Sequence, residues 1–211
     1  MKIAVTILIC SVLFIACAES TTGTQPNVEK INLSNYQTAY FAAGCFWCVE
    51  AIFESVDGVV EVESGYAGGT IENPTYSLVS AGKTEHAEAV RVYYDSSIVS
   101  FNTLVEVFFN SHDPTTLNRQ GPDRGAQYRS IAFFQTKREQ IIVKSMIKKL
   151  LADESFSIIT TEVKYLEKFY LAEAYHQDYE KNHPDNPYVQ RVSIPRLEAF
   201  KRKMPEILKG H

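Results

Sequence analysis

A glycine followed by two closely spaced cysteines lies between a predicted buried strand and a predicted helix. The strand covers residues 39–42, and the next segment reads Gly44-Cys45-Phe46-Trp47-Cys48. Apolar residues then recur at helical spacing, namely Phe46, Val49, Ile52, Phe53 and Val56. Gly44 therefore marks a strand-to-helix turn, which places Cys45 in or beside the first helical turn. Unpaired N–H groups and the positive end of the helix dipole meet there, so we expect a stabilised, nucleophilic Cys45 thiolate near neutral pH.

The spacing of Cys45 and Cys48 is also compatible with three other interpretations. The pair can be half of a zinc site, although the only other cysteines lie near the N-terminus and the five histidines are scattered. It can be a thioredoxin-like redox motif, which also follows a strand and opens a helix. It can be two inert core thiols, which the flanking aromatic residues permit and the helix-start position disfavours. The pattern alone leaves these alternatives open.

A carboxylate on the apolar face of a strand is the second unusual feature. Val90, Val92 and Tyr94 share one face of a strand predicted over residues 87–94, and Glu88 has the same parity. Burying a charged carboxylate is costly unless it is paired or neutralised. A buried Glu88 would therefore have a raised pKa and carry a proton that it can donate. The alternative is that the strand frays at residue 88, which leaves Glu88 solvated.

The order of the other predicted elements favours one α+β domain, with helices packed on a mixed sheet. Further strands are predicted over residues 60–66, 131–134 and 159–165. Further helices are predicted over residues 101–109, 136–150, 175–179 and 195–204. Two long polar loops, after Gly69 and after Pro114, carry Tyr76 and the Asp123-to-Arg129 stretch. Loops of this length in a compact domain are usually functional or disordered.

Composition sets broad limits on partners. The chain has 211 residues, of which 45% are hydrophobic, and a formal net charge of −4. This suits one globular domain of ordinary size. The negative charge argues against nucleic acid and against a polybasic membrane patch.

The N-terminal region is predicted to direct export. Residues 3–16 form an apolar run after Lys2 that is too short to span a bilayer comfortably, as in a signal peptide. Phe14-Ile15-Ala16-Cys17 resembles a bacterial lipobox, although Phe14 replaces the usual Leu. Cleavage before Cys17 would leave a lipidated N-terminus. The alternative is ordinary secretion, with cleavage before Glu19.

These features divide the chain into three predicted parts. Residues 1–16 are a signal peptide, and residues 17–35 are a lipidated Cys17 followed by a flexible polar tether. Residues 36–211 form the folded domain. We therefore expect the protein in the bacterial cell envelope, as a lipoprotein or as a periplasmic or secreted protein, with the lipid as its only membrane contact.

Taken together, these stretches resemble peptide methionine sulfoxide reductase of the A class, which acts on the S epimer of the sulfoxide. The resemblance covers about residues 37–190 and is carried by an ordered set of short motifs. They are Gly44–Trp47, Gly65–Gly69, Tyr76, His86–Glu88, His112–Thr116, Asp123–Ser130 and Tyr175–Tyr179. The resemblance implies that residues 36–211 are the catalytic domain. It also implies a two-layer α+β sandwich with a ferredoxin-like core and a site open on its surface.

The resemblance also implies roles for individual residues in the reaction. Cys45 matches the nucleophile that attacks the sulfoxide sulfur, and Glu88 matches the acid that protonates the departing oxygen. Tyr76 and Tyr128 match the phenols that hydrogen-bond this oxygen. Thiolate and neutral acid must coexist, which requires two groups whose environments separate their pKa values.

Three further residues match the substrate-binding part of the family site. Phe46 and Trp47 match the apolar walls around the substrate methyl group, and Asp123 matches a carboxylate that orients the substrate. The implied substrates are oxidised proteins and peptides that contain methionine sulfoxide.

Cys48 is a departure from the family pattern, which more often has Gly at this position. Many family members carry resolving cysteines near the C-terminus, whereas this chain has none after Cys48. This points to Cys48 as the thiol that condenses with a Cys45 sulfenic acid to form a disulfide. An external thioredoxin-type dithiol would then reduce the disulfide, and a monomer would act without cofactor or metal.

Two hypotheses of other classes remain for comparison. A thiol–disulfide oxidoreductase without sulfoxide chemistry explains the two cysteines, but it leaves Glu88, Tyr76 and Tyr128 without roles. A lipid-anchored structural protein predicts neither sulfoxide nor disulfide reduction.

Overall fold

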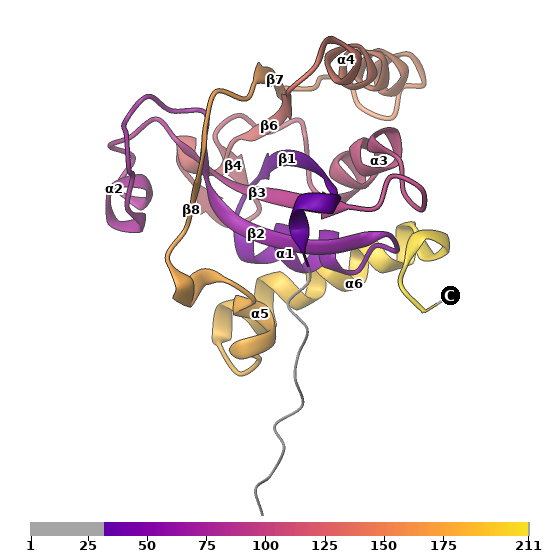
Figure 1. Ribbon diagram of the computed structural model, residues 1–211. Coiled ribbons are helices and arrows are strands. Elements are labelled where there is room, and N and C mark those ends of the chain that lie inside the picture. The colour runs from indigo at the N-terminus through magenta and orange to yellow at the C-terminus, as the bar shows by residue number, and fades with distance from the viewer. Residues whose placement is uncertain (1–31, 211) are drawn as a thin grey trace, which may run out of the picture. The chain divides into compact units, whose positions relative to one another are not determined.

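A six-stranded mixed sheet forms the centre of the domain (Figure 1). The computed structural model describes residues 32–210. The strands are β1 Gln37–Ala43, β2 Val59–Ala67, β3 Ala87–Tyr94, β6 Ser130–Phe134, β7 Glu162–Tyr165 and β8 Phe169–Leu171. Their spatial order is β7-β6-β1-β3-β2-β8, and every neighbouring pair is antiparallel except β6 and β7. The mixed sheet expected from the sequence is therefore confirmed.

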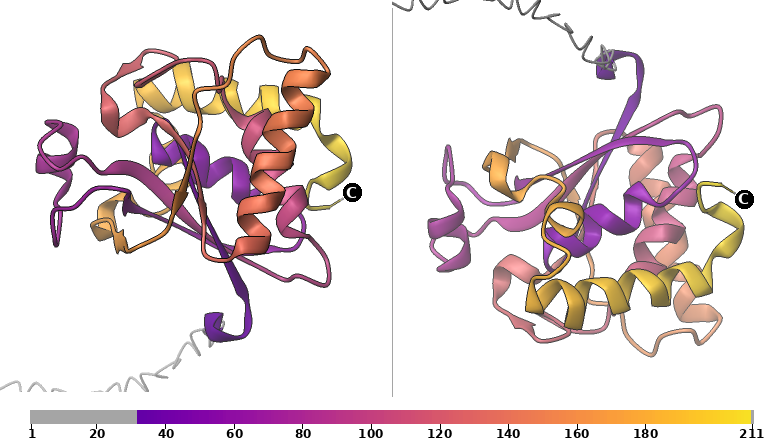
Figure 2. Two further views of the ribbon diagram at one scale, coloured as in Figure 1. Left: turned by 90° about the horizontal axis from the view of Figure 1, so that it is seen from above. Right: turned by 90° about the horizontal axis from the view of Figure 1, so that it is seen from below.

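Two helices, α1 Phe46–Glu54 and α3 Phe101–Ser111, connect strands of the sheet and pack against it. Along the chain the core runs β1-α1-β2-β3-α3-β6, and its strands lie in the order β6-β1-β3-β2. This is the ferredoxin-like arrangement, so the predicted α+β fold is confirmed. Two outer helices, α4 Lys137–Ala152 and α6 Ile194–Lys203, both pack against α3. Helix α6 also runs beside α1, as Figure 2 (right) shows in yellow and indigo.

Shorter elements complete the described chain. They are α2 Tyr76–Ser80, α5 Tyr179–Asn182, the π-helical turn Val189–Ser193, and a hairpin of β4 Arg119–Gln120 with β5 Asp123–Arg124. Four 3-10 turns cover Leu33–Asn35, Ala126–Tyr128, Ala174–His176 and Pro205–Ile207. Within residues 32–210, every helix is too short or too polar to cross a membrane. The predicted signal peptide and the tether as far as residue 31 lie outside the described residues.

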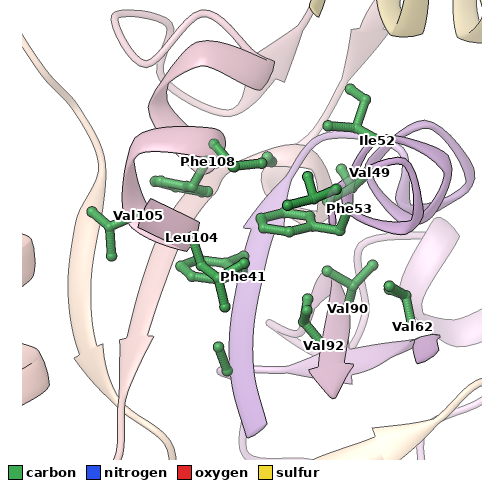
Figure 3. Close-up of a cluster of buried hydrophobic side chains, with 14 of the residues drawn as sticks. Phe41, Val49, Ile52, Phe53, Val62, Val90, Val92, Leu104, Val105 and Phe108 are labelled. Carbon is green, nitrogen blue, oxygen red and sulfur yellow. The ribbon is translucent and has the colours of Figure 1, made fainter. Parts of the chain in front are cut away.

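The core lies between the sheet and its helices and is rich in phenylalanine (Figure 3). Phe41 of β1 is fully buried, and its ring stacks at 5.0 Å on Phe53 of α1 and at 5.1 Å on Phe108 of α3. The opposite face of β1 is also covered, because Tyr40 and Ala42 belong to a second, smaller cluster. Burial on both faces explains why this strand is a continuous apolar run instead of an alternating one.

The structure corrects details of the sequence prediction. Apolar and polar residues alternate over residues 60–66, which predicts a strand with one solvated face, but the pattern is interrupted where the register shifts between Val59 and Glu61. Gly65 lies on the face expected to be solvated, yet it is buried because β8 pairs beside it and the Phe169 ring covers it. The strand predicted over 159–165 is shorter, and the loop after Gly69 contains α2. Short elements such as β8 have too few residues for a periodic pattern.

Candidate active site

The turn between β1 and α1 places Cys45 at the head of the helix. Gly44 has φ +91°, a conformation that favours glycine, and a Cβ at this position would lie 2.6 Å from the Gln120 Cβ. Cys45 is the N-cap residue of α1, with φ −54° and ψ 122°. The predicted position of Cys45 at the helix start is therefore confirmed.

Glu88 reaches the same helix start from β3. Its Oε2 accepts the Phe46 N–H at 3.1 Å, which satisfies one of the free donors of the first turn. The strand begins at Ala87, and Glu88 pairs with Tyr66 and is 2% exposed, so the frayed, solvated alternative is wrong. Burial raises the pKa of Glu88 to about 8, although the hydrogen bond from Phe46 opposes the rise. The carboxyl therefore carries a proton at neutral pH.

A pocket of about 330 Å³ joins these groups to residues from distant parts of the chain. Its lining consists of Cys45, Phe46, Trp47, Tyr76, Glu88, Asp123, Tyr128, Asn186 and Tyr188. Seven of the eight residues predicted to catalyse or bind substrate therefore share one pocket. Cys48 is the exception, because it lies one helical turn beyond Cys45, is 1% exposed and does not line the pocket.

Two phenols enter the pocket from the two long loops. Tyr76 is the first residue of α2, and its N–H donates to Glu173 Oε1 at 2.9 Å. Tyr128 ends the 3-10 turn that follows β5. Burial and the nearby Glu88 raise the pKa of Tyr76 to about 12 and also raise the pKa of Tyr128. Both hydroxyls therefore remain protonated and can donate hydrogen bonds at neutral pH.

Aromatic packing holds the apolar side of the pocket. The Trp47 ring stacks on Tyr179 with centroids 3.7 Å apart and planes 7° from parallel. The Trp47 Nε1–H donates to His176 Nδ1 at 3.1 Å, and the Phe46 ring lies 4.9 Å from the His176 ring. Burial lowers the pKa of His176, so the ring is neutral and can accept this bond. His176 and Tyr179, from the Tyr175–Tyr179 motif, therefore hold the Phe46 and Trp47 rings in position.

The sequence prediction missed Asn186 and Tyr188. The Tyr188 hydroxyl donates to Asp123 Oδ2 at 2.6 Å and lies 3.9 Å from Cys48 Sγ. It thus links the predicted substrate-orienting carboxylate to the thiol pair. Asn186 lies within the Pro- and Asn-rich stretch of residues 183–187 and Tyr188 directly follows it, and no periodic or motif signal marks either residue. Only the return of the C-terminal segment to the pocket reveals them.

The two free thiols share a hydrogen bond and behave as a pair. Burial raises the pKa of Cys45 well above its ordinary value, and the neighbouring Cys48 and Glu88 raise it further. The hydrogen bond from Cys45 lowers the pKa of Cys48 to about 6, against its burial and with help from the charge of Arg196. Of the two thiols, Cys48 therefore ionises more readily. The expected lowering of the Cys45 pKa at the helix start is wrong in direction, because burial raises this pKa and Glu88 takes the Phe46 N–H.

The arrangement defines the chemistry that the pocket can perform. A small apolar group can lie against the Phe46 and Trp47 rings. An oxygen beside it can face two phenol donors and the protonated carboxyl of Glu88, while the Cys45 sulfur approaches the atom that carries this oxygen. Within residues 32–210, no group of three or more His, Cys, Asp or Glu side chains could hold a metal ion.

Comparison with known proteins identifies the family. The family model for peptide methionine sulfoxide reductase matches residues 37–207. Peptide methionine sulfoxide reductase MsrA 1 of Rhodopirellula baltica is 47% identical over 183 residues, covering 87% of this chain and 95% of the relative. Peptide methionine sulfoxide reductase MsrA of Saccharolobus solfataricus is 43% identical over 175 residues, covering 83% of this chain and 98% of the relative.

Solved structures agree with this assignment. Methionine sulfoxide reductase A of Corynebacterium diphtheriae superposes with a TM-score of 0.64 at 38% identity, covering 71% of this chain and 76% of that chain. Mxr1 of Saccharomyces cerevisiae in reduced form superposes with a TM-score of 0.67 at 32% identity, covering 71% of this chain and 87% of that chain. The chain therefore belongs to the peptide methionine sulfoxide reductase family and is an oxidoreductase that reduces methionine sulfoxide.

Proposed function

We propose that the chain reduces the S epimer of methionine sulfoxide, free or in proteins, through a Cys45 sulfenic acid and a Cys45–Cys48 disulfide. The observation that carries the proposal is the meeting of a cysteine, a protonated carboxyl and two protonated phenols in one pocket. A thiol–disulfide oxidoreductase needs only the two cysteines. It gives no reason to bury Glu88 beside the helix start.

In the first step, the Cys45 sulfur attacks the sulfur of the sulfoxide. Its proton passes to the Cys48 thiolate along the hydrogen bond that joins the thiols. Glu88 gives its proton to the sulfoxide oxygen, while Tyr76 and Tyr128 donate hydrogen bonds to it. The sulfur–oxygen bond of the substrate breaks as the oxygen moves to Cys45. Methionine leaves, and Cys45 becomes a sulfenic acid.

Substrate orientation rests on the aromatic wall and on the carboxylate across the pocket. Phe46 and Trp47 receive the methyl group, whose burial favours the bound state. Asp123, held by the Tyr188 hydroxyl at 2.6 Å, orients the substrate from the opposite side.

In the second step, Cys48 attacks the sulfenic sulfur of Cys45. Side chains three residues apart on a helix have Cβ atoms about 5–6 Å apart, whereas a disulfide requires about 3.8 Å. Cys45 is the N-cap and already has non-helical ψ, so only the helix start must adjust. A thioredoxin-type dithiol then reduces the disulfide by thiol exchange.

The test of the two-cysteine cycle is the stoichiometry of methionine release. With thioredoxin as the only reductant, Cys48→Ser should release about one equivalent of methionine per enzyme and then stop, with a sulfenic acid on Cys45. Cys45→Ser should release none. Steady turnover of Cys48→Ser at the parent rate would remove Cys48 from the mechanism. Substrate made of the opposite epimer is the stereochemical control and should not react.

The setting of the reaction is a bacterial cell envelope, in which the domain works as a lipid-anchored monomer on oxidised exported proteins. Support comes from the lipobox-like stretch that ends at Cys17, which lies outside the described residues. The mass of the mature N-terminus, after expression of the full chain in bacteria, tests this placement. A diacylated chain that starts at Cys17 is expected. An unmodified chain that starts at Glu19 would instead indicate ordinary secretion.

A further inference from the structure

Arg196 lies against the backbone that carries the nucleophile. It is the third residue of α6, and it is half-buried. Its Nε–H donates to the Ser111 carbonyl at 2.7 Å, and its Nη2–H donates to the Ala43 carbonyl at 2.9 Å. Its Nη1 lies 3.5 Å from the point where a Cβ on Gly44 would be. The guanidinium therefore touches the turn immediately before Cys45.

The charge of Arg196 is not neutralised by a carboxylate. The ion pairs found within residues 32–210 involve other residues, and both hydrogen-bond acceptors of Arg196 are backbone carbonyls. A half-buried cation with neutral partners exerts its field on whatever ionisable group lies nearby. Here those groups are Cys48, Asp123 and His112.

The surroundings of Cys48 favour a negative charge on its sulfur. Cys45 donates to it from the same helix, and the Tyr188 hydroxyl, which donates to Asp123, lies beside it at 3.9 Å. Arg196 supplies the positive charge, and it helps to lower the pKa of Cys48 to about 6. Glu88 is the carboxyl that acts on Cys48, and it is neutral below about pH 8. A cation and the Cys45 donor thus favour the charged form of this thiol.

The first step of the reaction removes the strongest of these contacts. Once Cys45 is a sulfenic acid, its thiol proton is no longer available to Cys48. Cys48 also holds the proton that it received from Cys45 and must release it before it can attack, because the thiolate is the nucleophile. Arg196 is then the positive charge that remains to stabilise the thiolate.

We propose that Arg196 is a positioning residue for the second step, in which its charge favours the thiolate of Cys48 for attack on the Cys45 sulfenic acid. This inference rests on the proposed role of Cys48 as the resolving thiol. In the step, the Cys48 thiolate forms the sulfur–sulfur bond, and the sulfur–oxygen bond of the sulfenic acid breaks. The oxygen leaves with the electron pair as hydroxide and takes a proton from solvent to become water.

A purely structural role must be separated from this one, because Arg196 also connects α6 to the ends of β1 and α3. Arg196→Gln and Arg196→Met remove the charge, whereas Arg196→Lys keeps it. Arg202→Gln is the matched control, because Arg202 is an exposed arginine on the same helix. Two uncharged variants keep the test possible if one of them folds poorly.

The deciding measurement is the titration of Cys48 in the full chain with Cys45→Ser. The ultraviolet absorbance of the thiolate is followed against pH, and the signal of the Cys45→Ser/Cys48→Ser chain is subtracted. Arg196→Gln and Arg196→Met should raise the pKa of Cys48 by about one unit, which is a tenfold fall in the ratio of thiolate to thiol at a given pH. Arg196→Lys and Arg202→Gln should titrate like the parent. An unchanged titration in the uncharged variants would overturn the proposal.

Single-turnover kinetics with intact cysteines link the titration to the reaction. Methionine release and loss of free thiol are measured in the same sample at neutral pH. The first thiol, Cys45, is lost as methionine is released. In Arg196→Gln, loss of the second thiol, Cys48, should slow and lag behind methionine release, and Arg196→Lys should restore its rate. Equal slowing of both signals would overturn the proposal in favour of a structural role. If the parent releases methionine without forming the disulfide, the role of Cys48 fails, and this inference fails with it.

Discussion

Glu88 and Cys45 show how single residues receive properties that their side chains lack in water. Both are almost fully buried, and burial disfavours the charged form of each. For Glu88 this produces a proton donor at neutral pH, which suits a general acid. For Cys45 it keeps the thiol protonated, and in the proposed reaction this proton passes to Cys48. Neutral acid and latent thiolate can thus coexist in one pocket.

Replacement of Glu88 tests the acid directly. Glu88→Gln keeps the shape of the side chain but has no transferable proton. Methionine release should slow by roughly 10²- to 10⁴-fold, the range that general acid catalysis supplies. A rapid-quench assay measures the rate, and circular dichroism checks that the fold is retained. A parent-like rate in a folded variant would exclude the acid role.

The pH dependence of methionine release follows from the same carboxyl. The protonated form is the active one, and burial raises its pKa to about 8. The rate of the first step should therefore fall as the pH rises through about 8. Single-turnover rates across this range measure the midpoint. A rate that keeps increasing through this range would mean that another group supplies the proton.

Two buried carboxyls also affect stability. Burial raises the pKa of both Glu88 and Glu50 from 4.5 to about 8. The folded chain therefore binds more protons than the unfolded chain between pH 4.5 and about pH 8. Their contribution to stability is complete below the unfolded pKa and is lost as the pH rises through about 8. Melting temperatures should fall over this interval, and Glu50→Gln should reduce the slope. If the melting temperature of Glu50→Gln depends on pH as steeply as that of the parent, Glu50 does not have the raised pKa.

At the scale of elements, the segment after β8 is fixed to the sheet and to α1 by a polar network. The Gln177 side chain accepts from Ser64 N at 2.9 Å, and its amide donates to the Ser64 and Ala172 carbonyls at 3.1 Å. Glu50 accepts from the Asp178 N–H at 3.0 Å and from the Ser64 hydroxyl at 2.9 Å. These bonds hold Asp178 in a left-handed conformation, with φ 52°. The next residue is Tyr179, which stacks on Trp47.

Removal of the Gln177 amide should therefore loosen the packing of Tyr179 on Trp47, which forms the apolar side of the pocket. We expect Gln177→Ala to lower the free energy of unfolding by about 2 kcal/mol, because it leaves backbone groups without partners. It should also raise KM more than it lowers kcat, since the reacting groups stay in place while the wall moves. Chemical denaturation and steady-state kinetics measure the two effects. Gln190→Ala, at an exposed position, is the control and should change neither.

At the scale of the whole molecule, the C-terminal segment completes a site that the ferredoxin-like core only begins. The core supplies the helix start at Cys45 and the acid on β3. The chain then returns across the helices and contributes His176, Tyr179 and Tyr188. A site built from both ends of the domain forms only when the whole domain folds.

The described domain should be catalytically independent of residues 1–31. It forms one compact unit from Asn32 onward, and every residue assigned to the site lies within it. A chain that starts at Asn32 should therefore reduce a sulfoxide peptide with a kcat/KM within about twofold of the full chain, because uninvolved residues rarely alter such sites. Steady-state assays with a soluble dithiol measure this. A larger loss would assign the N-terminal region a role in the reaction.

Features with a local cause were predictable from the sequence. The strand, the glycine turn and the helical spacing after Phe46 are neighbours along the chain, so they place Cys45 at a helix start. The two-residue period of a strand likewise placed Glu88 on the apolar face. The motif order indicated the family because each motif is a short continuous stretch. The Thr136 and Glu139 capping box was also readable, since both of its bonds lie within one helical turn.

Features that depend on distant pairing were decided only by the tertiary structure. The sequence left open whether Glu88 is buried, and the answer came from the Phe46 N–H, 42 positions away. Tyr188 reaches Asp123 across 65 positions, and Arg196 reaches Ala43 across 153. The rise in the pKa of Cys45 comes mainly from its burial, which these distant segments complete. Periodicity records which face of an element is buried, whereas the ionisation of a thiol depends on which distant groups pack against it.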